Sequence, residues 1–262
     1  MSLTRRQLFV NGSISVGAAA GLSGVLLPRF IDSAKADPAA TAQAPAATTQ
    51  APAATTQAPA ATPQTAAPST PPTDAKVLAE LAKPSPGGDV VLGSAKAPVT
   101  IYEYASMTCP HCAHFSETTF PELKKRYIDT GKVRFIFRAF PFDKVAAAAF
   151  MLASCARDNG GGGARYMAVV ETLFAKQDEW VNDHPLKPLE NLAKQLGFSD
   201  ASFKACLTNQ KVLNNIEAVR DRAVDKLGVN STPTFFINGK KVVGDVPIET
   251  MAKEIDPYLK TG

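Results

Sequence analysis

The residues with the clearest potential for chemistry are Cys109, Pro110, His111 and Cys112, which together form a C-P-H-C motif. Two cysteines at this spacing can form a reversible disulfide or contribute to a metal site. A strand-like run precedes the motif and a helix-like run follows it, which predicts Cys109 at a helix N-terminus. Unpaired backbone N–H groups and the positive end of the helix dipole favour thiolate over thiol there. The motif therefore predicts a reactive dithiol.

The two residues between the cysteines suit this position. Pro110 fits the first helical turn, where its missing N–H would be unpaired in any case. His111 can supply a cation or a hydrogen-bond donor beside the sulfurs. Both residues are therefore candidates for tuning the thiols.

Other uses of the motif are less well supported. Covalent haem attachment requires histidine at position 113, which is alanine. A metal site would need two further ligands, and His114 is one candidate, but Cys155 and Cys206 do not form a second C-x-x-C pair. A purely structural disulfide in so short a loop would restrain little unfolded-chain entropy.

The chain divides into three parts of unlike composition: residues 1–36, 37–75 and 76–262. Four basic residues and one acidic residue give residues 1–36 a formal charge of +3, so the chain's +4 leaves +1 for the remainder. Most of the excess positive charge therefore lies in residues 1–36, and a nucleic-acid-binding surface is not indicated.

Residues 1–36 have the layout of a signal peptide. Arg5 and Arg6 precede an apolar run over residues 8–27, and Ala34-Lys35-Ala36 supplies a cleavage site. The paired arginines resemble twin-arginine leaders, and a Sec leader is the alternative. An uncleaved leader would instead anchor the chain in a membrane. Both outcomes predict a location outside the cytoplasm, in the periplasm or at the cell-envelope exterior.

Residues 37–75 are predicted to form a disordered linker. Gln43, Gln50, Gln57 and Gln64 each begin a near-copy of Q-A-P-A-A-T-T. A period of seven is typical of coiled coils, but a proline in every repeat and the lack of large apolar residues exclude one. Extended, polyproline-like chain is the structure expected of this composition.

Residues 76–262 show the pattern of one α/β domain. Residues 99–105 and 132–138 are predicted strands joined by a helix that begins at Pro110, and such a unit favours parallel strands. A helical region follows over about 143–228, opened by Asp143 as a helix cap. Asn238-Gly239 then predicts a hairpin turn, and a helix closes the chain. Within the helical region the predicted helices are 143–156, 164–179, 188–196, 200–208 and 211–227, with a flexible break at 160–163; the hairpin is 234–237 with 240–243, and the closing helix is 247–259.

The motif, the preceding Glu103-Tyr-Ala-Ser and a late Thr232-Pro233-Thr234 resemble the DsbA-like thiol–disulfide oxidoreductases. The resemblance covers about residues 88–260. It implies a thioredoxin-like fold with an all-helical insertion between the βαβ unit and the C-terminal ββα unit.

The resemblance also implies roles for single residues. Cys109 would be the attacking cysteine and Cys112 its buried partner. Pro233 would follow a cis peptide bond facing the disulfide, and Thr232 would pair with substrate backbone. Glu103 would assist proton movement, although its alternation with apolar neighbours also allows it to face solvent. Without the resemblance, Thr232-Pro233 would be an ordinary turn at the start of a strand.

Cys155 and Cys206 are expected to form a second disulfide. The cysteine count is even, the expected compartment is oxidising, and some relatives carry an extra disulfide in this insertion. In a reducing compartment both would instead be buried thiols.

The function implied is oxidation of thiols in unfolded or reduced exported proteins. The cysteine pair itself would carry the electrons, with no further cofactor, and a membrane partner similar to DsbB would reoxidise it. A monomer is expected. The alternatives are a disulfide isomerase or reductase of the same fold, and a metal- or copper-handling protein that uses Cys109, Cys112 and His111.

Overall fold

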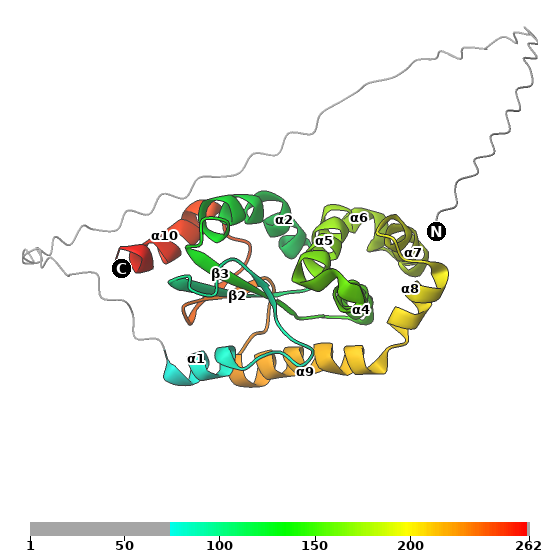
Figure 1. Ribbon diagram of the computed structural model, residues 1–262, viewed down its shortest axis with the longest axis horizontal. Coiled ribbons are helices and arrows are strands. Elements are labelled where there is room, and N and C mark those ends of the chain that lie inside the picture. Colours follow the sequence, from blue (N-terminus) through cyan, green and yellow to red (C-terminus); the bar gives the residue numbers. More distant parts are fainter. Residues whose placement is uncertain (1–73, 261–262) are drawn as a thin grey trace, which may run out of the picture. The chain divides into compact units, whose positions relative to one another are not determined.

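The computed structural model describes residues 74–260 (Figure 1). The predicted signal peptide and the predicted linker as far as residue 73 lie outside the described residues. No helix in the described range is long and apolar enough to cross a membrane.

A mixed sheet of five strands forms the centre of the fold, in the order β1-β3-β2-β4-β5. The central strand β2 runs parallel to β3, as predicted for a βαβ unit, and antiparallel to β4. At one edge β1 pairs antiparallel with β3, and at the other edge β5 pairs antiparallel with β4. The strands are β1 (Val90–Leu92), β2 (Val99–Ala105), β3 (Val133–Ala139), β4 (Thr234–Ile237) and β5 (Lys240–Val243).

The hairpin between β4 and β5 turns at Asn238-Gly239, as the sequence predicted. Both residues have positive φ, 45° and 89°, a backbone conformation that asparagine and glycine tolerate best. The Asn238 side chain also accepts a hydrogen bond from Thr100 N at 2.8 Å. The turn is therefore fastened directly to the start of β2.

Helices cover both faces of the sheet (Figure 1). On one face, Tyr104 and Phe236 pack with side chains of α1 (Ala75–Ala82) and α9 (Gln210–Leu227). On the other face, Ile101 and Phe235 belong to the larger core, together with residues of α2 (Pro110–Thr118) and α10 (Ile248–Leu259). β2 is therefore covered on both sides, which explains its near-continuous apolar sequence.

The connection from β2 to β3 is largely helical but is not one regular helix. It consists of α2, α3 (Phe120–Leu123) and the π-helical turn η1 (Lys124–Ile128). Pro121 lies in the first turn of α3. Because proline lacks the N–H that a continuing helix requires, α2 ends before it and a separate helix, α3, begins.

The helical insertion between β3 and β4 lies largely beyond the end of the sheet (Figure 1). Asp143 caps its first helix by accepting from Ala146 N at 2.8 Å, as predicted. The glycines at 160–163 were predicted to form a flexible break; the structure has a kink between two helices there, with non-helical backbone at Asn159 and at Gly160, whose φ is 90°. Gly228 ends α9 in the left-handed region, with φ 61°. Before α9 the insertion contains α4 (Lys144–Ala156), η2 (Arg157–Gly161), α5 (Gly162–Ala175), α6 (Gln177–Trp180), α7 (Leu186–Gln195) and α8 (Asp200–Leu207).

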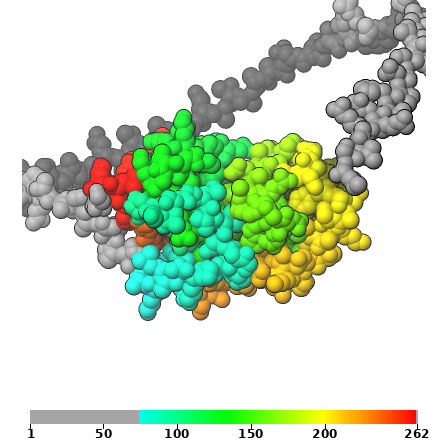
Figure 2. Space-filling model, in the orientation of Figure 1, coloured from blue at the N-terminus to red at the C-terminus, as the bar shows by residue number. Residues whose placement is uncertain are grey.

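Two elements, α1 and β1, were not predicted from the sequence. Arg138 on β3 holds the segment between them: its guanidinium donates to Leu81 O at 2.9 Å, Lys83 O at 3.0 Å and Tyr104 Oη at 3.0 Å. It also pairs with Asp89 at 3.2 Å. Figure 2 shows this N-terminal segment, in cyan, on the surface beside the orange α9. A buried arginine thus fixes the turn between the two elements, while Leu81 of α1 and Val90 of β1 are buried in the core.

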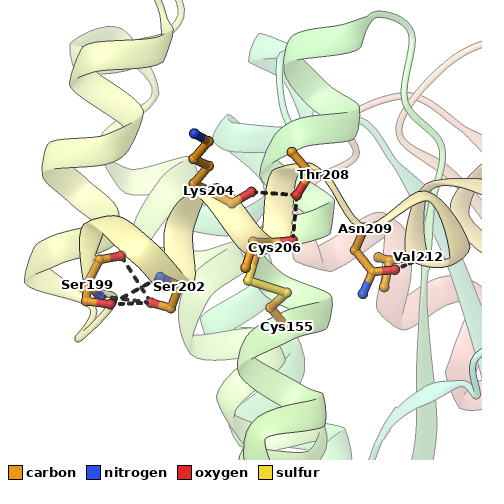
Figure 3. Close-up of a disulfide and its surroundings, with 9 residues drawn as sticks. Cys155, Ser199, Ser202, Lys204, Cys206, Thr208, Asn209 and Val212 are labelled. Carbon is orange, nitrogen blue, oxygen red and sulfur yellow. Dashed lines mark hydrogen bonds between the residues drawn. A yellow bond between two sulfur atoms is a disulfide. The ribbon is translucent and has the colours of Figure 1, made fainter.

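Cys155 and Cys206 form a disulfide that joins α4 to α8 (Figure 3). Their Cα atoms are 6.0 Å apart, and 51 positions separate them in sequence. This disulfide lies within the insertion and joins the two helices that enter and leave its outer part.

Candidate active site

Cys109 lies at the junction of β2 and α2, as the sequence predicted. It occupies the N-cap position of α2, and only 8% of the residue is exposed. Its Sγ donates to the carbonyl oxygen of Thr232 at 3.3 Å. Cys112 follows one turn later and is fully buried, and both residues are free thiols in this structure. The reduced pair therefore has one sulfur at the surface of the site and one inside it.

The surroundings shift the two thiols in opposite directions. A hydrogen bond from Cys112 is the largest cause that lowers the pKa of Cys109, to about 5, against the opposing effect of burial. Smaller contributions come from Thr232 and from the backbone N–H groups of His111 and Cys112. Burial is the main cause that raises the pKa of Cys112 well above its ordinary value, with the hydrogen bond and charge of Cys109 adding to it. The pair is thus divided into a thiolate and a thiol.

The peptide bond between Thr232 and Pro233 is cis. Its place in the fold, directly before β4, brings the Thr232 carbonyl to the Cys109 sulfur. The Thr232 side chain is buried at the same place, and its hydrogen bonding acts to lower the pKa of both sulfurs. Main chain and side chain of Thr232 therefore both present polar groups at the site.

Glu103 lies on β2, paired in register with Phe137 of β3 and Phe235 of β4. The sequence left open whether it faces solvent; the structure buries it, with 4% exposed. Burial raises the pKa of its carboxyl to about 8, and its charge in turn raises the pKa of Cys112. Glu103 is therefore an acid whose protonation changes near neutral pH, close to the inner thiol.

Pro110 and His111 form the start of α2, as predicted. The imidazole of His111 is on the exposed surface, and the interaction with Cys109 runs through its backbone N–H. His114, considered above as a metal ligand, is exposed, and its Nδ1 contacts the Asp245 carboxylate. No group of three or more His, Cys, Asp or Glu side chains within residues 74–260 is placed to hold a metal ion.

Two polar contacts of the site were missed in the sequence. Gln177 on α6 donates through Nε2 to Met107 O at 2.9 Å and Cys109 O at 3.1 Å. Asp143, predicted only as a helix cap, also accepts from Thr108 Oγ1 at 2.7 Å. The residues that these contacts join are 35 to 70 positions apart, and no local pattern marks such a partnership.

A surface hollow of about 400 Å³ opens beside Cys109. Phe142 and Val181 stand on its rim, with 53% and 36% exposed. An apolar hollow next to a reactive thiol can receive a side chain that flanks the cysteine of an incoming chain. The remaining residues around it are Thr108, Pro110, Asp143, Val145 and Asn182.

Comparisons with known proteins agree with this geometry. The family model described as thioredoxin matches residues 85–257, more than half of the chain. The crystal structure of Wolbachia pipientis alpha-DsbA1 is 34% identical, with a TM-score of 0.63, and the match covers 69% of this chain and 96% of that one. The chain belongs to the DsbA-like family. The resemblance found in the sequence, and the thioredoxin-like fold that it implied, are therefore confirmed.

Other matches to this DsbA-like chain agree. The oxidised BdbD of Bacillus subtilis is 26% identical, with a TM-score of 0.60, over 68% of this chain and 96% of that one. A Rickettsia conorii protein named as a protein-disulfide oxidoreductase is 35% identical over 173 residues, which is 66% of this chain. The chain spans about three fifths (61%) of that relative's length.

Proposed function

We propose that this DsbA-like protein is an exported thiol–disulfide oxidoreductase that introduces disulfides into reduced or unfolded proteins. The observation that carries the proposal is the opposite shift of the two thiol pKa values, to about 5 for Cys109 and upward for Cys112. A dithiol divided in this way has one stable thiolate and one protonated, shielded partner, which is the state that favours release of a disulfide to a substrate.

The reaction is two thiol–disulfide exchanges. In the oxidised enzyme, a substrate thiolate attacks Sγ of Cys109; a new S–S bond forms as the Cys109–Cys112 bond breaks, and Cys112 leaves as a thiolate that takes up a proton. A second substrate thiolate then attacks the substrate sulfur of the mixed disulfide and expels Cys109 as a thiolate. Two electrons pass from the substrate dithiol to the enzyme, and the substrate gains one disulfide.

Glu103 is placed to serve the proton step. With a pKa of about 8, its carboxyl is mostly protonated at pH 7 and can exchange a proton with the buried site. We assign it to proton delivery to Cys112 when that sulfur leaves. Cys112 needs such help because burial makes its thiolate unfavourable.

The direction follows from the stability of the reduced form. A Cys109 pKa of about 5 means that the thiolate is the predominant form of this residue at pH 7. Stabilising the reduced enzyme makes the oxidised enzyme a stronger oxidant, because the two forms are linked by the exchange equilibrium. This argument favours an oxidase over an isomerase or reductase, which must be kept reduced.

Substrate binding would use the main chain of Thr232 and the hollow rimmed by Phe142 and Val181. An extended segment can hydrogen-bond to the backbone beside the cis bond while its neighbouring side chain enters the hollow. This mode of binding recognises the backbone and one apolar side chain of the substrate and does not require a particular sequence. It suits a catalyst that acts on many unfolded chains.

The cysteine pair carries the electrons in this proposal, with no bound cofactor. Continued turnover requires reoxidation, for which we propose a membrane partner similar to DsbB. The leader would export the chain to the periplasm or cell-envelope exterior, where oxidation is possible. We expect the protein to act as a monomer.

The reduction potential of the Cys109–Cys112 pair in glutathione buffers tests the direction. A value of about −120 mV, that of DsbA, supports an oxidase. A value of about −200 mV or below contradicts it and favours an isomerase or reductase. The double variant Cys155→Ser/Cys206→Ser isolates the signal of the active pair.

Metal analysis of the purified, reduced protein tests the remaining alternative. About one copper ion per chain, lost in the Cys109→Ser variant, would favour a metal-handling role over exchange. Protein without bound metal that still oxidises dithiol peptides supports the proposed activity.

A further inference from the structure

Gln177 joins the helical insertion to the backbone of the reactive cysteine. It is the first residue of α6, and 8% of it is exposed. Its Nε2 donates to Met107 O at 2.9 Å and to Cys109 O at 3.1 Å. A primary amide has two N–H donors, so both are used on these two carbonyl groups.

The carbonyl of Cys109 is also the first acceptor of α2. It accepts from Cys112 N at 3.1 Å and Ala113 N at 3.2 Å. Gln177 therefore contacts the group that starts the α2 hydrogen-bond pattern, and through Met107 it also holds the loop that leads from β2 into the helix. Movement of this loop would move the Cys109 Sγ relative to the α2 N-terminus.

Gln177 is itself held rigidly. Trp180, at the other end of α6, is fully buried and donates from Nε1 to Leu173 O on α5 at 2.8 Å. Both ends of this short helix are thus fixed by hydrogen bonds to neighbouring segments. A rigid donor is what a fixed backbone geometry at a reactive group requires.

We propose that Gln177 is a positioning residue that fixes the Cys109 main chain, so that Sγ stays at the N-terminus of α2 and beside Thr232. The inference rests on the proposed role of Cys109 as the nucleophile. It adds that the helical insertion, through α6, takes part in setting the reactivity of a cysteine that belongs to the thioredoxin-like part.

The physical reason lies in what stabilises the thiolate. The Cys112 thiol, Thr232 and the first backbone N–H groups of α2 act on Sγ only over hydrogen-bond distances, and their effect weakens when the sulfur moves. The titratable or charged groups around the site include His111, His114 and Glu117 on α2, Glu103 on β2, Asp143 at the start of α4, and Lys176, Asp178 and Glu179 beside Gln177. Removing the Gln177 donors changes none of these charges, so a shift in Cys109 titration would report geometry.

The test substitutes Gln177→Met in the full chain, which keeps the length and bulk of the side chain but removes both donors. Gln195→Met, at the exposed end of α7, is the matched control. The titration of Cys109 is followed by thiolate absorbance in the reduced protein. We expect the Cys109 pKa to rise by about one unit in Gln177→Met only, which is the scale of a lost hydrogen bond to a charged group. Alkylation of Cys109 at pH 5 should then slow by about fivefold, in proportion to the thiolate fraction.

An unchanged titration in a variant that is only less stable to denaturant would overturn the proposal, since it would reduce Gln177 to a packing role. If Gln177→Met does not fold, Gln177→Asn makes the same test, because its amide is one methylene too short to keep both contacts. Failure of the proposed function is a separate result: the wild-type protein would then fail to oxidise dithiol peptides, whatever the titration of the variants.

Discussion

The sulfur of Cys109 lies 3.3 Å from the carbonyl oxygen of Thr232, although 123 positions separate the two residues in sequence. The contact joins the C-P-H-C motif at the end of β2 to the cis bond before β4. The contact is possible because β2 and β4 are neighbours in the sheet and pair antiparallel. A reactive sulfur and the backbone that we propose for substrate binding therefore lie in contact before any substrate arrives.

Substituting either active cysteine should give different results. Cys109→Ser removes the nucleophile, and we expect it to abolish oxidation of a dithiol peptide. Cys112→Ser keeps the nucleophile but removes its partner, so we expect mixed disulfides to accumulate with substrate, visible by mass spectrometry. Substantial peptide oxidation by Cys109→Ser would disprove the assignment of the nucleophile.

The stability of the reduced protein relative to the oxidised one should rise with pH. The Cys109 pKa is lowered from 9.0 to about 5 in the folded state, so its stabilisation is fully present above pH 9 and is lost as the pH falls through 5. Cys112, whose pKa is raised, opposes this only above its ordinary value of 9.0. Glu103 titrates in both redox forms and largely cancels from the difference.

Denaturant unfolding of both forms at pH 5, 7 and 9 measures this relation. If the difference in the free energy of unfolding between reduced and oxidised protein stays constant from pH 5 to 9, the lowered pKa of Cys109 is contradicted. Direct titration of the thiolate absorbance, with Cys109→Ser as the blank, gives the pKa independently.

Replacing Glu103 by glutamine should stabilise the protein at neutral pH. A carboxyl whose pKa is raised from 4.5 to about 8 destabilises the fold as the pH rises from 4.5 to 8, because only the unfolded chain ionises freely. Glu103→Gln removes this cost, which is about 3 kcal/mol at pH 7. The free energy of unfolding of the two proteins should differ least near pH 4.5 and most above pH 8.

The same variant should react more slowly with substrate dithiols, since Cys112 loses its proposed proton source. Faster or unchanged exchange in Glu103→Gln would remove Glu103 from the mechanism and leave its burial unexplained. Glu122→Gln, on the exposed side of α3, controls for a glutamate-to-glutamine change outside the site.

Loss of the second disulfide should lower stability without removing exchange. The Cys155–Cys206 bond closes a loop of 51 positions, which corresponds to about 4 kcal/mol in the chain-entropy model. We expect Cys155→Ser/Cys206→Ser to lose up to that amount in denaturant unfolding. Wild-type protein with this disulfide reduced should have the same free energy of unfolding as the variant. If both have the same free energy of unfolding as the oxidised wild-type protein, the bond contributes no net stability.

Local sequence determined much of the fold. Asn238-Gly239 fixes the hairpin because both residues tolerate positive φ, and Asp143 and Gly228 mark helix ends through capping. Alternation and helical spacing revealed the other central elements. α1 and β1 are only eight and three residues long, and the contacts that fix them, from Arg138 and from pairing with β3, come from far away in sequence.

The chemistry divides in the same way. The sequence by itself determined which residues react, because Cys109 and Cys112 flank the first turn of a helix whose start can be predicted from local pattern. Only the tertiary structure decided how reactive each is. Burial of Glu103, contact with Thr232 and the donors of Gln177 all depend on segments brought together by the sheet and the insertion. Desolvation and hydrogen bonding act through space, so no local pattern in the chain records them.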